Sequence, residues 1–116
     1  MRENKKYDLE DRTFKFAKRV AAYVNNLGKT ISNVEFGKQL VRAGGSVGAN
    51  YIEANESLSK KDFAMRIKIS RKEAKESGYW LKLTECKSEY IKEREWLINE
   101  SIEIMKIFGA ILETTK

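Results

Sequence analysis

Lysines recur between residues 60 and 90 at a spacing that places their side chains along one line. Four of them are seven residues apart: Lys61, Lys68, Lys75 and Lys82. Seven residues make nearly two helical turns, so these side chains, with Lys72 between them, would form one ridge that also carries Tyr79. Such a ridge can bind the phosphates of RNA or DNA, while the ring contacts a base or sugar. The ordinary alternative is a solvated surface partly neutralised by acidic residues on neighbouring turns.

A second basic group lies between residues 8 and 27, on the side away from Leu9, Phe16 and Val20. Its members are Arg12, Lys15, Lys18 and Arg19. If both segments present these faces to the same side, the two groups merge into one surface, and the sequence leaves this open. No helix-turn-helix spacing, zinc finger or ribonucleoprotein aromatic motif accompanies them, so any contact with nucleic acid is expected to be independent of base sequence.

A line of polar residues runs along the segment from residue 33 to residue 56. Its members are Arg42, Ser46, Asn50 and Glu53, at spacings of four, four and three. We expect these side chains to form a structural network with Glu73 and Glu76 of the next segment. The alternative is a ligand site lined by Arg42, Asn50 and Glu53.

Three glycines accompany this polar line, at positions 44, 45 and 48. Each costs about 1 kcal/mol relative to alanine inside a helix. Their spacing matches neither of the common phosphate-binding glycine motifs, and no strand is predicted before them. We therefore expect a tight contact between helices, within one chain or between copies of it.

Residue types needed for most catalytic and metal chemistry are scarce in this chain. The 116 residues include no histidine and one cysteine, Cys86. An internal disulfide, a Cys/His metal cluster and a histidine base are thereby excluded, and a catalytic thiol would have no histidine to activate it. We predict a protein that is not an enzyme, has no cofactor or metal, and keeps Cys86 inert.

The elements that must position these groups are helices. The chain has no proline, and its apolar residues recur every three or four positions, which predicts helices over about 8–27, 33–56, 60–90 and 93–113. Ser32 with Glu35, and Ser59 with Asp62, have the spacing of helix N-caps. Short polar connections then predict an all-α, up-down-up-down antiparallel four-helix bundle as a single domain over residues 1–116.

Residues 40–54 and 72–81, with Phe63 and Ile67 between them, carry a resemblance over nearly the whole chain. The two blocks read LVRAGGSVGANYIEA and KEAKESGYWL. They resemble the four-helix-bundle family encoded in intervening sequences of bacterial 23S ribosomal RNA genes, which is itself similar to the accessory variability protein of diversity-generating retroelements. The resemblance implies a ring-like homopentamer without known enzymatic activity. In the retroelement branch it also implies a basic surface that works with nucleic acid and a reverse transcriptase. Polar positions of the family motif are matched by Arg42, Ser46, Asn50, Glu53 and Glu76.

The charge balance fits these expectations. Twenty-three Lys and Arg face seventeen Asp and Glu, for a net charge of +6. No long apolar run suggests a membrane span or a secretory signal, so we expect a cytoplasmic protein. The function predicted from the sequence is an oligomeric scaffold that binds RNA or DNA backbone non-specifically. The alternative is an adaptor that binds another protein and has no role with nucleic acid.

Overall fold

Four α-helices make up the fold in the computed structural model, which describes residues 5–115, with side chains from residue 8 onward. Their bounds are Lys5–Asn25 for α1, Ile31–Asn55 for α2, Lys60–Leu83 for α3 and Ile91–Thr115 for α4. A short 3₁₀ turn, η1, precedes α4 at Ser88–Tyr90. Within the described residues there is no strand, which confirms the all-α prediction.

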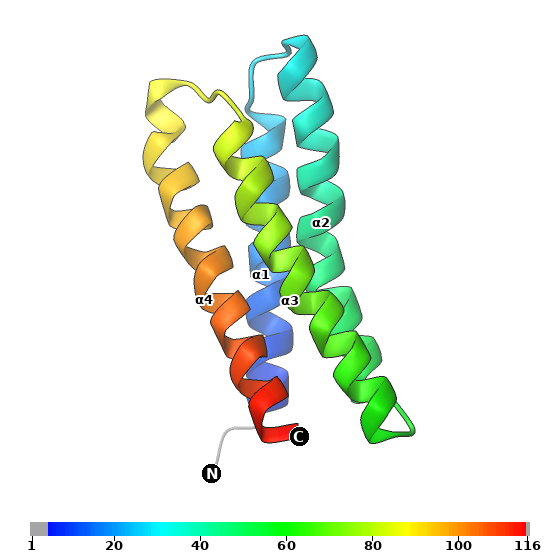
Figure 1. The fold of residues 1–116 in the computed structure, drawn as a ribbon. Coiled ribbons are helices and arrows are strands. Elements are labelled where there is room, and N and C mark those ends of the chain that lie inside the picture. The colour runs from blue at the N-terminus through cyan, green and yellow to red at the C-terminus, as the bar shows by residue number, and fades with distance from the viewer. Residues whose placement is uncertain (1–4, 116) are drawn as a thin grey trace.

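Helices that follow one another in the chain run antiparallel (Figure 1). α1 packs against α2 and α4, and α3 packs against the same two helices, so α1 and α3 lie diagonally across the bundle. The molecule measures 44 × 30 × 19 Å. None of the helices in residues 5–115 combines the length and apolar character of a membrane span.

Two side-chain caps define where the middle helices begin. Ser59 Oγ accepts a hydrogen bond from the Asp62 amide at 3.1 Å, which confirms the predicted cap of α3. The predicted cap of α2 at Ser32 is wrong, because α2 already begins at Ile31 and Thr30 Oγ1 accepts from the Asn33 amide at 3.1 Å. A cap satisfies one of the amides that have no partner in the first helical turn.

The end of α3 differs most from the prediction. We expected this helix to reach about residue 90, but it ends at Leu83. Thr84 has an extended backbone, and its hydroxyl lies 2.7 Å from both the Leu81 carbonyl and the Tyr23 hydroxyl. Hydrogen bonds to a residue of α1 thus replace the next helical turn. The other predicted helix ends lie within three residues of the observed ones.

Further polar contacts hold the chain just after α3. The Asn33 side chain donates to the Glu85 carbonyl at 2.9 Å and to the Gly28 carbonyl at 3.0 Å, and it accepts from the Glu85 amide at 3.0 Å. Arg94 Nη1 donates to the Thr84 carbonyl at 2.9 Å. We call Tyr23, Asn33, Thr84 and Arg94 the polar clasp. It joins all four helices at the end of the bundle where α1 meets α2.

Glycines on α2 allow α1 to approach closely. A β-carbon on Gly48 would lie 2.8 Å from Thr13 Oγ1, and one on Gly44 would lie 3.3 Å from Val20 Cγ1. The predicted tight contact is therefore present inside the bundle. Gly45 differs, because a β-carbon there would meet nothing within 4 Å. Gly78 of α3 has a corresponding role that the sequence did not indicate, since its β-carbon would lie 2.9 Å from Ser101 Oγ of α4.

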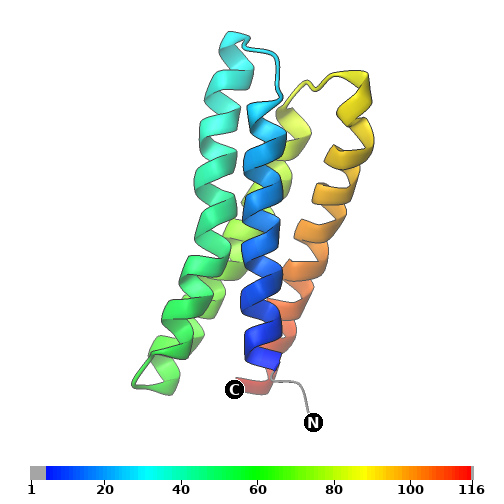
Figure 2. The ribbon, with the colours of Figure 1, turned by 180° about the vertical axis from the view of Figure 1, so that it is seen from behind.

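The opposite end of the bundle, where α1 begins and α4 ends (Figure 2), combines apolar contacts with a hydrogen bond from Asn55 of α2 to Glu10 of α1 at 3.3 Å. Tyr51 and Phe108 pack there with ring centroids 5.6 Å apart. Beside them is a cavity of about 430 Å³ lined mainly by Leu9, Phe63, Ile107 and Ile111. This end therefore has an apolar pocket open to solvent and fewer hydrogen bonds between helices than the polar clasp at the other end.

Candidate nucleic-acid interface

The five lysines of α3 form the ridge that their spacing predicts. We call Lys61, Lys68, Lys72, Lys75 and Lys82 the lysine ridge, and all five side chains are exposed. None forms an ion pair with another residue in the described part of the chain. The opposite face of α3 is buried at Ile67, Ala74 and Leu81, which fixes the outward direction of the lysines.

Tyr79 lies on the outward face of α3 among these lysines and is 58% exposed. Its ring meets the ring of Trp80 edge-on, with centroids 5.1 Å apart and an interplanar angle of 69°. Trp80 in turn packs against Phe36 of α2, with centroids 6.0 Å apart. The Tyr79 ring therefore packs against Trp80 and is otherwise open to solvent.

The two arginines of α1 have a different environment from the lysine ridge. Arg12 donates from Nε and Nη2 to the Glu100 carboxylate at 2.7 and 2.8 Å. Arg19 donates to the Glu93 carboxylate through the same two groups, with 3.0 Å between its Nε and Glu93 Oε2. Its guanidinium also lies 3.5 Å from the centroid of the Trp96 ring. The hydrogen bonds to these carboxylates raise the pKa of both arginines. Sequence reasoning missed these α4 partners because they are 74 and 88 residues away.

The remaining predicted residues of α1 are lysines near the surface. Lys15 pairs with Asp11 at 2.9 Å, with both side chains mostly exposed, and Lys18 is exposed with no ion pair in the described residues. α3 lies in front in Figure 1 and α1 in front in Figure 2, after a half turn. The basic residues of α1 therefore do not join the lysine ridge in one surface.

The predicted polar network is present in part. Arg42 Nη1 lies 3.9 Å from Glu73 Oε1, and the arginine also donates to Gln39 at 3.3 and 3.4 Å. The Glu73 side chain is only 9% exposed, and its Oε1 accepts no hydrogen bond within the described residues. Glu76 is half-buried and contacts neither Arg42 nor Asn50 by a hydrogen bond or ion pair.

Asn50 has a partner that the sequence did not indicate. Its side chain donates to the Ser46 carbonyl at 2.9 Å and accepts from Arg66 of α3 at 2.9 Å. The expected contact between Asn50 and the glutamates of α3 is therefore wrong, and Glu53 is exposed at the edge of this line. These bonds connect α2 to α3, which agrees with a structural role.

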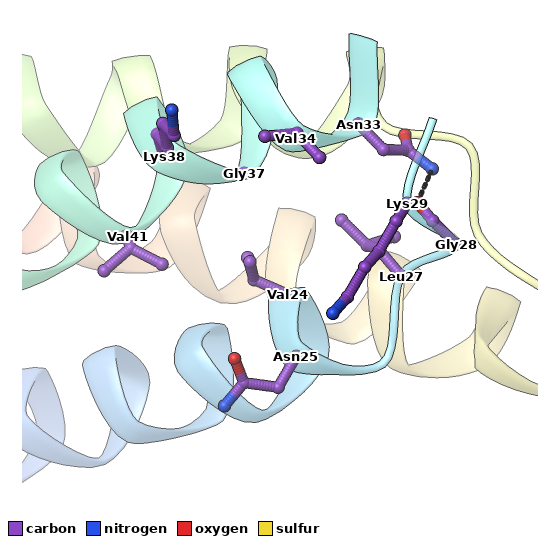
Figure 3. A pocket seen from close by; sticks show the side chains of 10 residues that line it. All are labelled: Val24, Asn25, Leu27, Gly28, Lys29, Asn33, Val34, Gly37, Lys38 and Val41. Atoms are coloured by element: carbon purple, nitrogen blue, oxygen red, sulfur yellow. Dashed lines mark hydrogen bonds between the residues drawn. The ribbon is translucent and has the colours of Figure 1, made fainter. Parts of the chain in front are cut away.

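An apolar groove lies between the end of α1 and the start of α2 (Figure 3). Its volume is about 610 Å³, and Val24, Val34 and Val41 line it, with Lys29 at the connection between the helices. Val34 and Val41 are both substantially exposed, although valine is usually buried. We call this the α1–α2 groove. Gly45 lies one turn beyond Val41 on the same helix.

Cys86 is a free, half-buried thiol beside Tyr23. Residues 8–115 contain no group of three or more acidic or cysteine side chains placed to hold a metal ion.

The fold defines a small antiparallel helical bundle. Residues 5–110 match the 23S rRNA-intervening sequence protein family, and the chain belongs to that family. A comparison with curated proteins gives no match. A solved relative is a protein of unknown function from the S23 ribosomal protein family of Bacteroides thetaiotaomicron. It is 30% identical, with a TM-score of 0.78, and the match covers 95% of this chain and 99% of that one.

Proposed function

We propose that this protein is a non-enzymatic scaffold that binds the backbone of RNA or DNA through the lysine ridge, without reading the base sequence. The observation that supports it is the set of five exposed ammonium groups on one helix, none neutralised by an ion pair with a described residue. From Lys61 to Lys82 the ridge is about 31 Å long. Neutralising four phosphates would give a slope of about −3.6 in log affinity against log salt on duplex DNA.

We further propose that several copies assemble into a closed ring, and the expected number is five. The α1–α2 groove is the surface we assign to contact with another copy, because it exposes valine and ends near Gly45, whose missing side chain leaves room for a helix. α3 packs on the other face of α2, so a copy seated in the groove leaves the lysine ridge uncovered. Repeating the ridge around a ring multiplies a weak single-site attraction.

A titration followed by fluorescence anisotropy tests the role of the ridge. The probes are labelled single- and double-stranded RNA and DNA of equal length. Changing Lys68, Lys72 and Lys75 to glutamate should abolish binding. The control changes Lys87, Lys92 and Lys106 to glutamate, which also lowers the net charge from +6 to zero but acts away from the ridge. Equal loss in both triple variants would mean that net charge, and not the ridge, drives binding.

Light scattering tests the assembly separately. Five copies of the 13.4 kDa chain give about 67 kDa. Val41→Lys introduces a charge into the α1–α2 groove and should reduce the mass to that of one chain. A mass unchanged by Val41→Lys would remove the groove from the interface.

An adaptor that binds another protein is the second candidate, and the same apolar groove favours it. The two candidates differ in a simple observation. A scaffold for nucleic acid should purify with a high ratio of absorbance at 260 to 280 nm that falls in high salt, whereas an adaptor should not.

A further inference from the structure

The basic residues of α1 line a second groove, which the proposed function does not use. This α1–α4 groove has a volume of about 370 Å³, within the range of about 300–1,000 Å³ typical of small-molecule sites. Trp96, which is 41% exposed, gives the groove an accessible aromatic surface, whereas Phe16, which also lines it, is only 1% exposed. The Arg19 guanidinium covers one face of this indole, 3.5 Å from the ring centroid, and the part of the ring that stays exposed offers a surface for another ring.

The arginines that cross this groove keep unused hydrogen-bond donors. Arg12 and Arg19 each bind a carboxylate through Nε and Nη2, so the Nη1 group of each makes no hydrogen bond within the described residues. A guanidinium has five N–H donors in a fixed plane, and the side-on pairing leaves the two on Nη1 pointing away from the carboxylate. A guanidinium is charged at neutral pH, so these donors keep their positive charge while the carboxylates are bound.

The charge around the groove favours an anion. Four cationic side chains stand there: Arg12, Lys15, Lys18 and Arg19. Three carboxylates, from Asp11, Glu93 and Glu100, pair with all of them except Lys18. One positive charge therefore remains, and the Lys15–Asp11 pair is exposed enough to exchange its partner at little cost.

We propose that the α1–α4 groove binds a nucleotide, with its base against the part of the Trp96 ring that Arg19 leaves exposed and its phosphate bound by Lys15, Lys18 and the free arginine donors. Inorganic phosphate alone would not contact the exposed Trp96 ring, and an uncharged ring alone would not pair with the cationic side chains. The same chemistry is offered by a free nucleotide and by the terminal nucleotide of a strand. This site is separate from the lysine ridge, because α1 lies diagonally opposite α3.

Tryptophan fluorescence provides a direct assay, because the chain has only two tryptophans, Trp80 and Trp96. Adenosine 5′-monophosphate, adenosine and inorganic phosphate are titrated into the full chain carrying the ridge substitutions Lys68→Glu, Lys72→Glu and Lys75→Glu. We expect saturable quenching by the nucleotide, with an affinity at least about tenfold higher than for either of its parts. Adding Lys15→Glu and Lys18→Glu should weaken nucleotide binding by at least about tenfold, whereas Lys87→Glu with Lys106→Glu should not.

Trp96→Phe should remove the fluorescence change. Trp96→Ala should weaken binding at least about tenfold in calorimetry, since the stacking surface is lost.

A matched pair of oligonucleotides, with and without a 5′-phosphate, separates the two sources of ligand. Tight binding of only the phosphorylated strand assigns the groove to strand ends, and binding of the mononucleotide alone assigns it to free nucleotides. The proposal is overturned by no saturable change, by phosphate binding as tightly as the nucleotide, or by charge reversal at Lys15 and Lys18 having no effect. None of these outcomes depends on whether the lysine ridge binds nucleic acid.

Discussion

Replacing Gly48 by alanine measures how closely α1 and α2 must approach. The new β-carbon would lie 2.8 Å from Thr13 Oγ1 and 3.2 Å from Thr13 Cβ. Thr13 is buried and branched, and its hydroxyl bonds to the Leu9 carbonyl at 2.9 Å, so it has no room to move aside. Overpacking of this kind costs about 1–3 kcal/mol, while the better helix propensity of alanine returns about 1 kcal/mol. We expect a net loss of up to about 2 kcal/mol.

Gly109→Ala is the matched control, because a β-carbon on this α4 glycine meets nothing within 4 Å. It should stabilise the protein by up to about 1 kcal/mol through helix propensity alone. Urea unfolding at one protein concentration gives both free energies, and each kcal/mol should also move the melting temperature by about 4 °C. If Gly48→Ala were as stable as Gly109→Ala, the close packing of α1 on α2 would not depend on the glycine, and our reasoning about it would fail.

Three further predictions concern the polar contacts. Asn33→Ala removes three hydrogen bonds between the start of α2 and two connecting segments. It should lower the free energy of unfolding, measured in urea, by about 2–3 kcal/mol. A loss under about 0.5 kcal/mol would show that water replaces these bonds. Burial raises the pKa of Tyr23 to about 12, so the folded state holds the phenol proton more tightly than the unfolded chain does. Its contribution to stability should be complete below pH 10 and decline between pH 10 and 12, and Tyr23→Phe should lack that part of the decline. Glu100→Gln weakens the pair with Arg12 and should cost about 1 kcal/mol, whereas Asp11→Asn, in an exposed pair, should change stability by less than about 0.5 kcal/mol.

Helix number and order could be predicted because apolar periodicity is a local property of the sequence. The end of α3 could not, because it depends on distant partners. Thr84 bonds to Tyr23 of α1, and Glu85 bonds to Asn33 of α2, at separations of 61 and 52 residues. Nothing within residues 84–90 marks the helix as ending there, so local propensity extended it too far.

The same distinction applies to the candidate sites. The lysine ridge was predictable because a spacing of seven residues fixes its members on one face of a helix. The environment of Arg12 and Arg19 was not predictable, because their partners lie on α4 and pairing depends on which helices are neighbours. Arg66 as the partner of Asn50 was missed for a similar reason, since α2 and α3 must first be set in register.

The unlike ends of the bundle have a consequence for its motion. Opening the polar clasp means breaking several directional hydrogen bonds at once. The end with the 430 Å³ pocket is joined mainly by apolar contacts, which can loosen one side chain at a time, together with the hydrogen bond between Asn55 and Glu10. Thermal opening should therefore begin where α1 starts and α4 ends, and spread toward the polar clasp. In amide hydrogen exchange, protection should rise along α1 from its first turn to its last. Along α4 it should fall from the first turn to the last.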